Sequence, residues 1–307
     1  MNSKILGTTK SQGQKEELDK FYTNPVIALR CIKMIEDITS YDDVIEPSAG
    51  SGSFANQIEK CKAYDIKPEG SGIEEADWFT LDKEQFSSNS LVIGNPPFGI
   101  QSKLAVNFFN EAAKFAKTIA FILPLSFKKD SVMNRLDLDF HLKKEVILPK
   151  NSFLLNGEDY NVPSVFQIWE RGSVKRAKIK YPMKSRYFAF VNRDNCDFRV
   201  PRVGGNTGVA TFSLEGATAS NYFIKNTSCL SNDDLVNLIN RTVFPSIEYT
   251  VGPKSLSRGE MVYTLDKEIK KEIAYIEDNI DPMGDQEDSE EAYPEDSVDL
   301  EEEEFED

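Results

Sequence analysis

The chain has few of the residues that metal sites, disulfide frameworks and membrane spans require. Its 307 residues include one histidine and four cysteines, which are far apart and form no Cys-x-x-Cys pair. This pattern argues against a zinc site and against a disulfide-rich secreted domain. No apolar run is long enough to cross a bilayer, and the first twenty residues are polar and contain no signal-peptide core. We therefore expect an intracellular protein in a reducing compartment, the cytoplasm or the nucleus, with no metal and no membrane partner.

Basic residues are absent from the end of the chain. Residues 277–307 contain seventeen Asp or Glu and no Lys or Arg, so removing them changes the formal net charge from −15 to +2. An acidic block with so few apolar residues cannot build a core, and we predict a disordered tail over residues 276–307. Three roles remain open for this tail: it solubilises the protein, it competes with nucleic acid for the basic face of the protein, or it binds a basic partner protein.

The chain also lacks the glycine spacing of dinucleotide-binding folds and the Lys-Ser/Thr pair of phosphate-binding loops. In their place, residues 43–54 form a short apolar run that reaches an acid, Glu46, and then a loop containing Gly50 and Gly52. Glycine permits a positive φ and lets a ligand approach the backbone closely. The pattern predicts the first strand–loop–helix unit of a doubly wound sheet, where ligands bind outside the carboxyl ends of the strands.

A second informative pattern lies in residues 91–99. An apolar run ends in Asn95-Pro96-Pro97-Phe98, which predicts a buried strand followed by a rigid turn. Proline has no backbone donor, so the side-chain oxygen of Asn95 and the carbonyl of Pro96 can converge on one planar amino group. The Phe98 ring offers a stacking face beside them. The segment suits an aromatic base with an exocyclic amine; the alternative is a strand-ending turn with a core phenylalanine.

Both motifs resemble those of S-adenosylmethionine-dependent adenine-N6 DNA methyltransferases. In that family the catalytic motif is (D/N/S)-P-P-(Y/F/W), and the cofactor loop reads Glu/Asp-Pro-Ser-Ala-Gly-x-Gly-x-Phe. The order along the chain is similar to the gamma arrangement, with the cofactor region first, the catalytic motif second and target recognition last. The resemblance covers roughly residues 21–169. It implies an α/β class, a Rossmann-like methyltransferase domain with a doubly wound, mostly parallel sheet, and S-adenosyl-L-methionine as cofactor.

The resemblance also implies roles for single residues. The segment Phe21-Tyr22-Thr23 is similar to one that covers the methionine end of the cofactor, although Asn24 here precedes the proline. Asp65 is the implied ribose ligand, Glu46 is implied near the methionine amino group, and Asp77 near the adenine amine. The alternatives are a helix N-cap for Thr23 and Asp77, and a turn residue for Asp65. The implied cofactor contacts are Phe21, Tyr22, Thr23, Glu46, Pro47, Ser48, Gly50, Gly52, Phe54, Asp65, Asp77, Trp78 and Asn95.

The implied reaction is methylation of the adenine N6 amine in nucleic acid, DNA rather than RNA, after extrusion of the base. The implied catalytic residues are Asn95, Pro96, Pro97 and Phe98, whose fixed acceptors would return the nitrogen lone pair to the amine. Stacking on Phe98 and Phe153 would offset part of the cost of extrusion, unless Phe153 is an ordinary core residue. Two alternatives stay open: methylation of an RNA base (adenosine, including capped mRNA, or the guanine amine), and an inactive methyltransferase fold that binds nucleic acid as a subunit.

Basic residues concentrate after the last expected strand. Seven Lys or Arg occur between residues 171 and 186 without an acid, and residues 177–181 alternate as in a strand. This favours phosphate binding over a solvated edge strand. A glycine-rich loop follows, whose amides can hold a phosphate unless it forms a bulged hairpin. The expected substrate contacts are Phe98, Phe153, Lys175, Arg176, Lys178, Arg202, Gly204 and Gly205.

Four parts follow along the chain. We predict a flexible N-terminus over residues 1–14, the methyltransferase domain over 15–172, a small mixed or β domain for nucleic-acid recognition over 173–275, and the acidic tail over 276–307. Helical periodicity marks residues 104–116 and 233–240, whereas residues 118–123, 146–149, 165–169 and 255–262 are strand-like. His141 lies in a charged segment that we expect to be a helix exposed to solvent.

Overall fold

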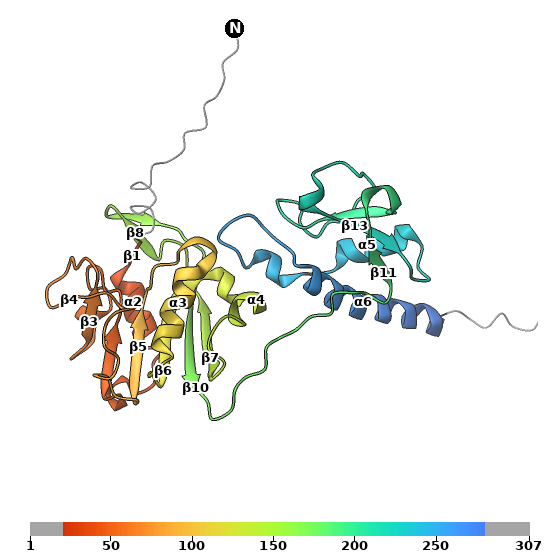
Figure 1. The fold of residues 1–307 in the computed structure, drawn as a ribbon. Helices are drawn as coiled ribbons and strands as arrows, with labels where there is room; N and C mark the ends of the chain where they lie inside the picture. The colour runs from red at the N-terminus through yellow and green to blue at the C-terminus, as the bar shows by residue number, and fades with distance from the viewer. Residues whose placement is uncertain (1–20, 280–307) are drawn as a thin grey trace, which may run out of the picture.

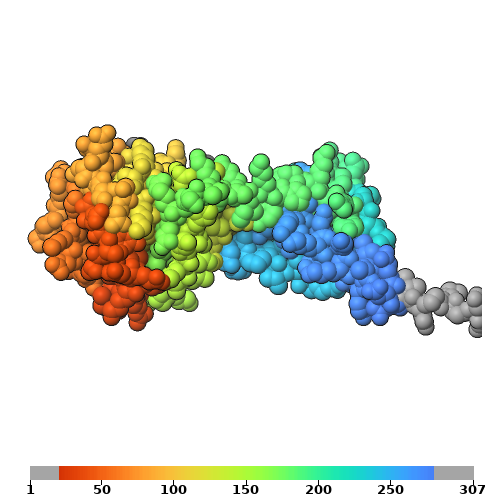
Figure 2. Space-filling view, turned by 90° about the horizontal axis from the view of Figure 1, so that it is seen from below, coloured from red at the N-terminus to blue at the C-terminus, as the bar shows by residue number. Residues whose placement is uncertain are grey.

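The computed structural model describes residues 21–279, which form two lobes (Figure 1). The first lobe comprises residues 21–171 and the second residues 188–279, and the extended joining segment is residues 172–187. The predicted N-terminal segment 1–14 and residues 280–307 of the acidic tail lie outside the described residues. Figure 2 shows the first lobe and the second lobe meeting at a narrower middle. Lys129 contributes to that junction, since its Nζ donates to the carbonyl (3.2 Å) and the hydroxyl (3.0 Å) of Ser255.

A seven-stranded sheet with the order β4-β3-β2-β5-β6-β10-β7 organises the first lobe. The chain runs outward from β2 to β4 and then returns to β5, so the strand order reverses between β2 and β5. That reversal is where open α/β sheets bind ligands. The predicted α/β class and Rossmann-like architecture are confirmed. The strands are β2 (Asp43–Glu46), β3 (Lys62–Asp65), β4 (Glu74–Glu75), β5 (Ser90–Gly94), β6 (Thr118–Pro124), β7 (Phe140–Ile147) and the antiparallel β10 (Ser164–Arg171).

Both faces of this sheet are covered, and alternate residues of each central strand serve opposite cores. On one face, Phe109 of α3 (Lys103–Ala112) meets the rings of Phe140 and Trp169 edge-on, with ring centroids 5.6 Å away in each case. On the other face, α2 (Pro25–Ile32) packs Ile27 against a cluster that includes Ile93. The strands β5 and β6 are buried along their whole length, which matches their continuous apolar sequence.

Short elements complete the first lobe. A small antiparallel sheet joins β1 (Tyr22–Thr23), β8 (Phe153–Leu155) and β9 (Glu158–Tyr160). After the glycine loop, the expected helix is reduced to the single 3-10 turn η2 (Ala55–Gln57). The others are the helix α4 (Asp130–Met133) and the 3-10 turns η1 (Ile38–Ser40), η3 (Ile100–Ser102) and η4 (Leu125–Lys128).

The second lobe has its own core. A three-stranded antiparallel sheet, β11 (Phe188–Phe190), β13 (Asn221–Asn226) and β12 (Phe198–Pro201), packs with α5 (Asn232–Arg241) and α6 (Arg258–Asn279). The turns η5 (Arg193–Asn195), η6 (Thr218–Ser220) and η7 (Pro245–Glu248) link them. The hydroxyl of Ser231 caps α5 by accepting the Asp234 amide at 3.1 Å. The separate core fits the predicted small mixed domain, while its boundary at residue 173 stays a prediction.

Three segments differ from the sequence prediction. Residues 177–181 form no strand; instead, the Asn134 side chain donates to the Ile179 carbonyl (2.7 Å) and accepts from the Ile179 amide (3.0 Å), replacing a neighbouring strand. The expected strand 255–262 is mostly the start of α6, and that helix continues to Asn279, past the expected boundary at 275. His141 lies on β7, not on a helix, and its Nε2 contacts the Val174 carbonyl at 2.7 Å. Within residues 21–279, no helix is long and apolar enough to cross a membrane.

Candidate functional site

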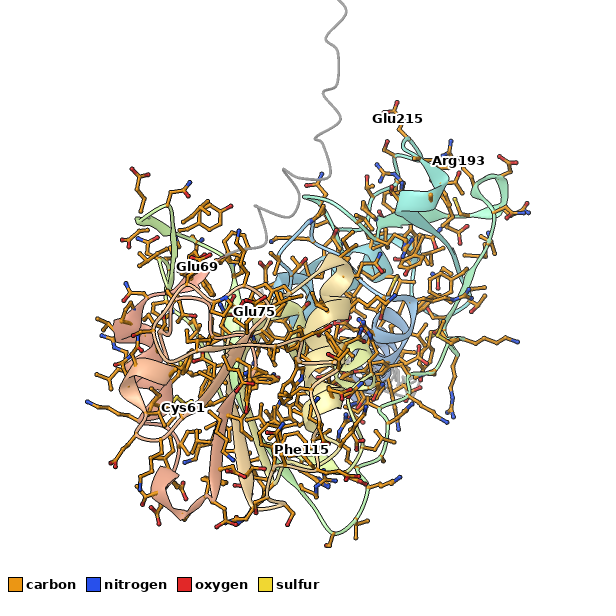
Figure 3. The ribbon with its side chains drawn as sticks, turned by 60° about the vertical axis from the view of Figure 1, so that its left-hand side comes forward. Cys61, Glu69, Glu75, Phe115, Arg193 and Glu215 are labelled. Carbon is orange, nitrogen blue, oxygen red and sulfur yellow. The ribbon has the colours of Figure 1, made fainter. Side chains whose placement is uncertain are left out.

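A pocket of about 400 Å³ opens at the carboxyl ends of β2, β3 and β5, where the strand order reverses. Its size lies within the range of about 300–1,000 Å³ that small-molecule sites occupy. Glu69, which lines the pocket, marks this end of the sheet in Figure 3, whereas Cys61 and Phe115 lie toward the opposite end. The motif Asn95-Pro96-Pro97-Phe98 and the loop after β2 both form parts of the wall.

Asn95 follows the last residue of β5 and has one polar atom without a partner. Its Nδ2 donates to the Phe21 carbonyl at 3.1 Å, and the Ser48 hydroxyl donates to the Asn95 carbonyl at 3.3 Å. The bond to Phe21 sets the orientation of the amide, which leaves Oδ1 buried and without a hydrogen-bond partner among the described residues. Because buried acceptors are nearly always paired, this oxygen is suited to a donor on a ligand.

The glycine loop is held by the acid at the end of β3. The Gly50 amide donates to Asp65 Oδ2 and the Lys67 amide to Oδ1, both at 2.8 Å. Gly50 has a φ of +54°, and a Cβ there would lie 3.3 Å from the Tyr22 ring. A side chain at position 50 would therefore be both strained and crowded. The Asp65 carboxylate keeps free lone pairs toward the pocket, because two oxygens offer about four acceptor sites.

Glu46, at the end of β2, is a carboxyl group taken out of water. Its side chain is 2% exposed, it accepts from the Ala55 amide at 2.8 Å, and it lines the pocket. Burial raises the pKa of Glu46 well above its usual range, and the nearby charge of Asp65 raises it further. Glu46 and Asp65 thus differ in environment: Glu46 is buried, whereas Asp65 accepts from two backbone amides.

The segment with Phe21, Tyr22 and Thr23 lies along the pocket wall as β1. The Tyr22 hydroxyl donates to Glu69 Oε2 at 2.6 Å, and burial together with this bond raises the pKa of Tyr22 to about 12. The helix N-cap is Asn24, whose side chain accepts from the Val26 amide. The alternative role of Thr23 as the N-cap is therefore wrong, because Asn24, which lies between Thr23 and Pro25, takes that position.

Asp77 and Trp78 both line the pocket, after β4. Asp77 Oδ1 accepts from the Phe79 amide at 2.9 Å, so this acid also shapes its own turn. The Trp78 side chain is buried, and its Nε1 has no hydrogen-bond partner in the part of the chain that the structure describes. Phe79 and the exposed Ile66 add apolar surface to this part of the wall.

Apart from the predicted phosphate contacts, three predicted contacts do not line the pocket. Phe54 is buried in the core beside α2, and Gly52, with a φ of +87°, bends the loop and donates to the Ala49 carbonyl. Phe153 is 0% exposed and meets Phe98 edge-on, at 6.3 Å and 90° between ring planes. The structure therefore makes Phe153 a core residue that holds the Phe98 ring and not a second stacking face.

Two of the predicted phosphate contacts serve the fold. Arg176 Nε donates to the Phe140 carbonyl (3.0 Å) and its Nη2 to the Leu136 carbonyl (3.1 Å), and burial lowers the pKa of this side chain. Arg202 Nη1 donates to the Ala219 carbonyl at 3.0 Å. None of the predicted phosphate contacts lines the pocket; Lys175 and Lys178 are exposed on the joining segment, and Gly204 and Gly205 lie on the second lobe.

The sequence did not single out nine residues that line the pocket. Ala49 and Ser53 belong to the glycine loop that the sequence had already indicated. Leu104 and Phe108 lie four residues apart on one face of α3, and the helical periodicity of residues 104–116 includes both. Glu69 lies in an irregular loop that has no periodic signal. The remaining four are Ile66, Lys67, Ala76 and Phe79.

Part of the chain is similar in sequence to known proteins. Residues 54–174 match the family model described as the EDM2 methyltransferase-like domain. The chain carries a methyltransferase-like domain. A curated relative, Protein ENHANCED DOWNY MILDEW 2 of Arabidopsis thaliana, is 32% identical over 170 residues; the match covers 45% of this chain but 13% of that protein. This chain thus spans a small part of that relative.

Two proteins of known structure have a lower sequence identity to this chain than that relative has. The 23S rRNA methyltransferase ErmE is 19% identical, with 50% of this chain and 71% of that chain covered and a TM-score of 0.35. A tRNA methyltransferase of M. jannaschii is 17% identical, with 51% of this chain and 50% of that chain covered and a TM-score of 0.34.

The raised pKa of Glu46 leads to a stability prediction. An acid whose folded-state pKa exceeds its ordinary value of 4.5 costs the fold stability as pH rises past that value, up to the folded-state pKa. Glu46→Gln keeps an oxygen for the Ala55 amide and carries no charge. Without ligand, we expect this variant to have a higher Tm than the wild type at pH 8, with the difference shrinking toward pH 4.5. Thermal unfolding followed by circular dichroism across this range measures it.

Glu75→Gln serves as the control, because Glu75 is exposed on β4 and does not line the pocket. Its Tm should follow that of the wild type at each pH. A Glu46→Gln variant with a Tm at pH 8 equal to or below that of the wild type contradicts the burial argument.

Proposed function

We propose that the chain transfers a methyl group from S-adenosyl-L-methionine to the exocyclic N6 amine of adenine in nucleic acid, DNA rather than RNA. The observation that carries this proposal is the buried Oδ1 of Asn95 in the pocket wall, which has no hydrogen-bond partner within residues 21–279. Pro96 and Phe98 line the pocket beside it. An acceptor in that position matches the amine of a planar base whose ring stacks on Phe98. The methyltransferase-like domain at residues 54–174 supports the reaction class.

The pocket residues fit the cofactor. Asp65 would accept from the ribose hydroxyls with the lone pairs that its two backbone bonds leave free. Glu46 and Tyr22 would border the methionine end, and Asp77 with Trp78 the adenine end. Gly50 lines the pocket beside the Tyr22 ring and has no side chain to cover the loop backbone there. When bound, S-adenosyl-L-methionine supplies a methyl group already activated on a sulfonium and keeps the electron pair of the broken carbon–sulfur bond.

The protein's task is to make an unreactive amine nucleophilic. The lone pair of an adenine amine is delocalised into the ring, and two acceptors that hold its hydrogens draw the nitrogen toward tetrahedral geometry. Asn95 Oδ1 and the Pro96 carbonyl are those acceptors, and Phe21 fixes the first of them before the base arrives. Dipoles fixed in advance stabilise the positive charge that develops on nitrogen, and positioning accounts for much of the remaining rate. Both oxygens hold the amine hydrogens until one proton is lost to water.

The joining segment supports a nucleic-acid substrate through its exposed lysines. Lys175, Lys178, Lys180 and Lys184 are exposed, and no acid interrupts residues 171–186. Contacts of this kind bind phosphates without reading sequence. The arginines of the segment contribute less than the sequence suggested, because Arg176 donates to carbonyls of the first lobe.

Asn95→Ala tests the catalytic role. Loss of one fixed catalytic hydrogen-bonding group typically lowers a rate by about 100-fold to 1,000-fold, and we expect at least such a loss here. Affinity for the cofactor should stay within a few fold, because Oδ1 faces the base. The assay combines tritiated cofactor with DNA and RNA for the rate, and calorimetry for cofactor affinity.

Asn192→Ala is the matched control, since Asn192 is exposed on the second lobe. It should keep wild-type activity. Substantial methyl transfer by Asn95→Ala would contradict the catalytic assignment. A wild-type chain that binds the cofactor and nucleic acid but transfers no methyl group would instead support the inactive subunit, and transfer to RNA alone would support the RNA enzyme.

Asp65→Ala tests the cofactor site. Each charge-assisted hydrogen bond contributes about 1.5–3 kcal/mol, so loss of the ribose contacts should weaken S-adenosyl-L-methionine binding at least tenfold in calorimetry. Asp65→Asn keeps an acceptor for a loop amide and should lose less. Glu75→Ala removes a nearby exposed acid outside the pocket and should bind normally. Unchanged affinity in Asp65→Ala would place the ribose site elsewhere.

A further inference from the structure

The loop directly after the catalytic motif presents an apolar side chain to solvent. Residues 99–103 connect Phe98 to Leu104, and both of these residues line the pocket, so the loop lies on its rim. Ile100 is 80% exposed, more than any other large hydrophobic side chain within residues 21–279. Two steps along the backbone separate it from Phe98, which limits their Cα atoms to a separation of about 7 Å.

This loop has a strained backbone. Gly99, Gln101 and Ser102 all adopt a positive φ, at 66°, 53° and 59°, and two of the three are not glycine. Residues with a Cβ rarely take this conformation, and they persist in it only where the surrounding structure holds them. Strain of this kind gathers at functional sites and is unusual in a plain connection between a strand and a helix.

Hydrogen bonds from three directions hold the loop. Arg135 Nη1 donates to the Gln101 carbonyl at 3.0 Å, and the hydroxyls of Ser102 and Ser126 lie 2.8 Å apart. The Ala105 amide donates to the Phe98 carbonyl at 3.3 Å, which closes the loop at its base. Hydrogen bonds to α3, to η4 and to the segment after α4 therefore hold the backbone that carries Ile100 in one conformation.

We propose that Ile100 is a wedge that enters the base stack beside the extruded nucleotide. The inference rests on the proposed function and assigns to this site a substrate whose target base starts in a stacked duplex. Extrusion leaves a gap in the stack, and an isoleucine inserted between base steps covers the exposed base faces with apolar surface. A rigid loop avoids the ordering cost that a flexible one would pay on insertion. Ile100 acts on extrusion and not on the methyl transfer that follows.

The test compares Ile100→Ala with the wild type on two forms of one DNA. The probes are a 40-base-pair duplex of randomised sequence and one of its strands alone, both with tritiated S-adenosyl-L-methionine. Without a stack to open, the single strand needs no wedge. We expect Ile100→Ala to lower kcat/KM on the duplex at least tenfold and to stay within twofold of the wild type on the single strand.

Val243→Ala is the matched control, because Val243 is 76% exposed but lies on the second lobe. It should leave both substrates unaffected. A second readout, 2-aminopurine fluorescence within the randomised duplex in the presence of sinefungin, reports extrusion without turnover and should fall in Ile100→Ala alone.

The outcomes separate the wedge from the proposed function. Equal loss on both substrates, no loss on either, or wild-type activity confined to single strands would overturn the wedge and leave adenine methylation standing. A wild type that methylates neither form, nor the corresponding RNAs, would overturn the proposed function and the wedge with it.

Discussion

The hydrogen bond from Asn95 Nδ2 to the Phe21 carbonyl determines which way the Asn95 amide points. With the amino group held at 3.1 Å, the oxygen is buried and has no hydrogen-bond partner in the part of the chain that the structure describes. The contact joins residues that are 74 positions apart, so it exists only when β1 has docked beside the end of β5. The orientation of the Asn95 amide thus depends on a contact between distant parts of the chain.

The buried carboxyl group of Glu46 carries a cost in stability that the fold has to offset. Glu46 is held in a dry position by the closely packed loop after β2, and burial raises the pKa of its carboxyl group. The core around it is extensive: β5 and β6 are wholly buried, and aromatic rings such as Phe109 and Trp169 meet edge-on beneath them. A rigid, apolar sheet can keep an acid and an unpaired acceptor in place before any ligand binds.

The sequence was sufficient for features with a local physical signature. Continuous apolar runs predicted β5 and β6, and the acid and glycines of residues 43–54 predicted the strand and loop at β2. The hydrogen bond from the Gly50 amide to Asp65 was not predicted. The sequence was insufficient where distant contacts decide. Phe153 became a core residue because Phe98 and Phe21 pack around it, and no pattern in residues 150–153 contains that information.

Charged residues were misjudged for the same reason. Seven basic residues between 171 and 186 predicted phosphate binding, but Arg176 donates to carbonyls of the first lobe, which only the folded chain brings near. The alternation over residues 177–181 predicted a strand. In the described structure, the Asn134 side chain provides the only side-chain hydrogen bonds to the Ile179 backbone, and no neighbouring strand pairs with it. A strand needs a partner, and alternation alone does not supply one.

We propose that Asn95 Oδ1 accepts a hydrogen bond from the exocyclic amine of the substrate base. A crystal structure of the full chain with sinefungin and an adenine-containing oligonucleotide tests it most directly. We predict the adenine amino nitrogen within about 2.7–3.2 Å of Asn95 Oδ1, with the Phe98 ring parallel to the base. An Asn95 Oδ1 bonded to a protein group or a water, with the base bound elsewhere, would contradict the account.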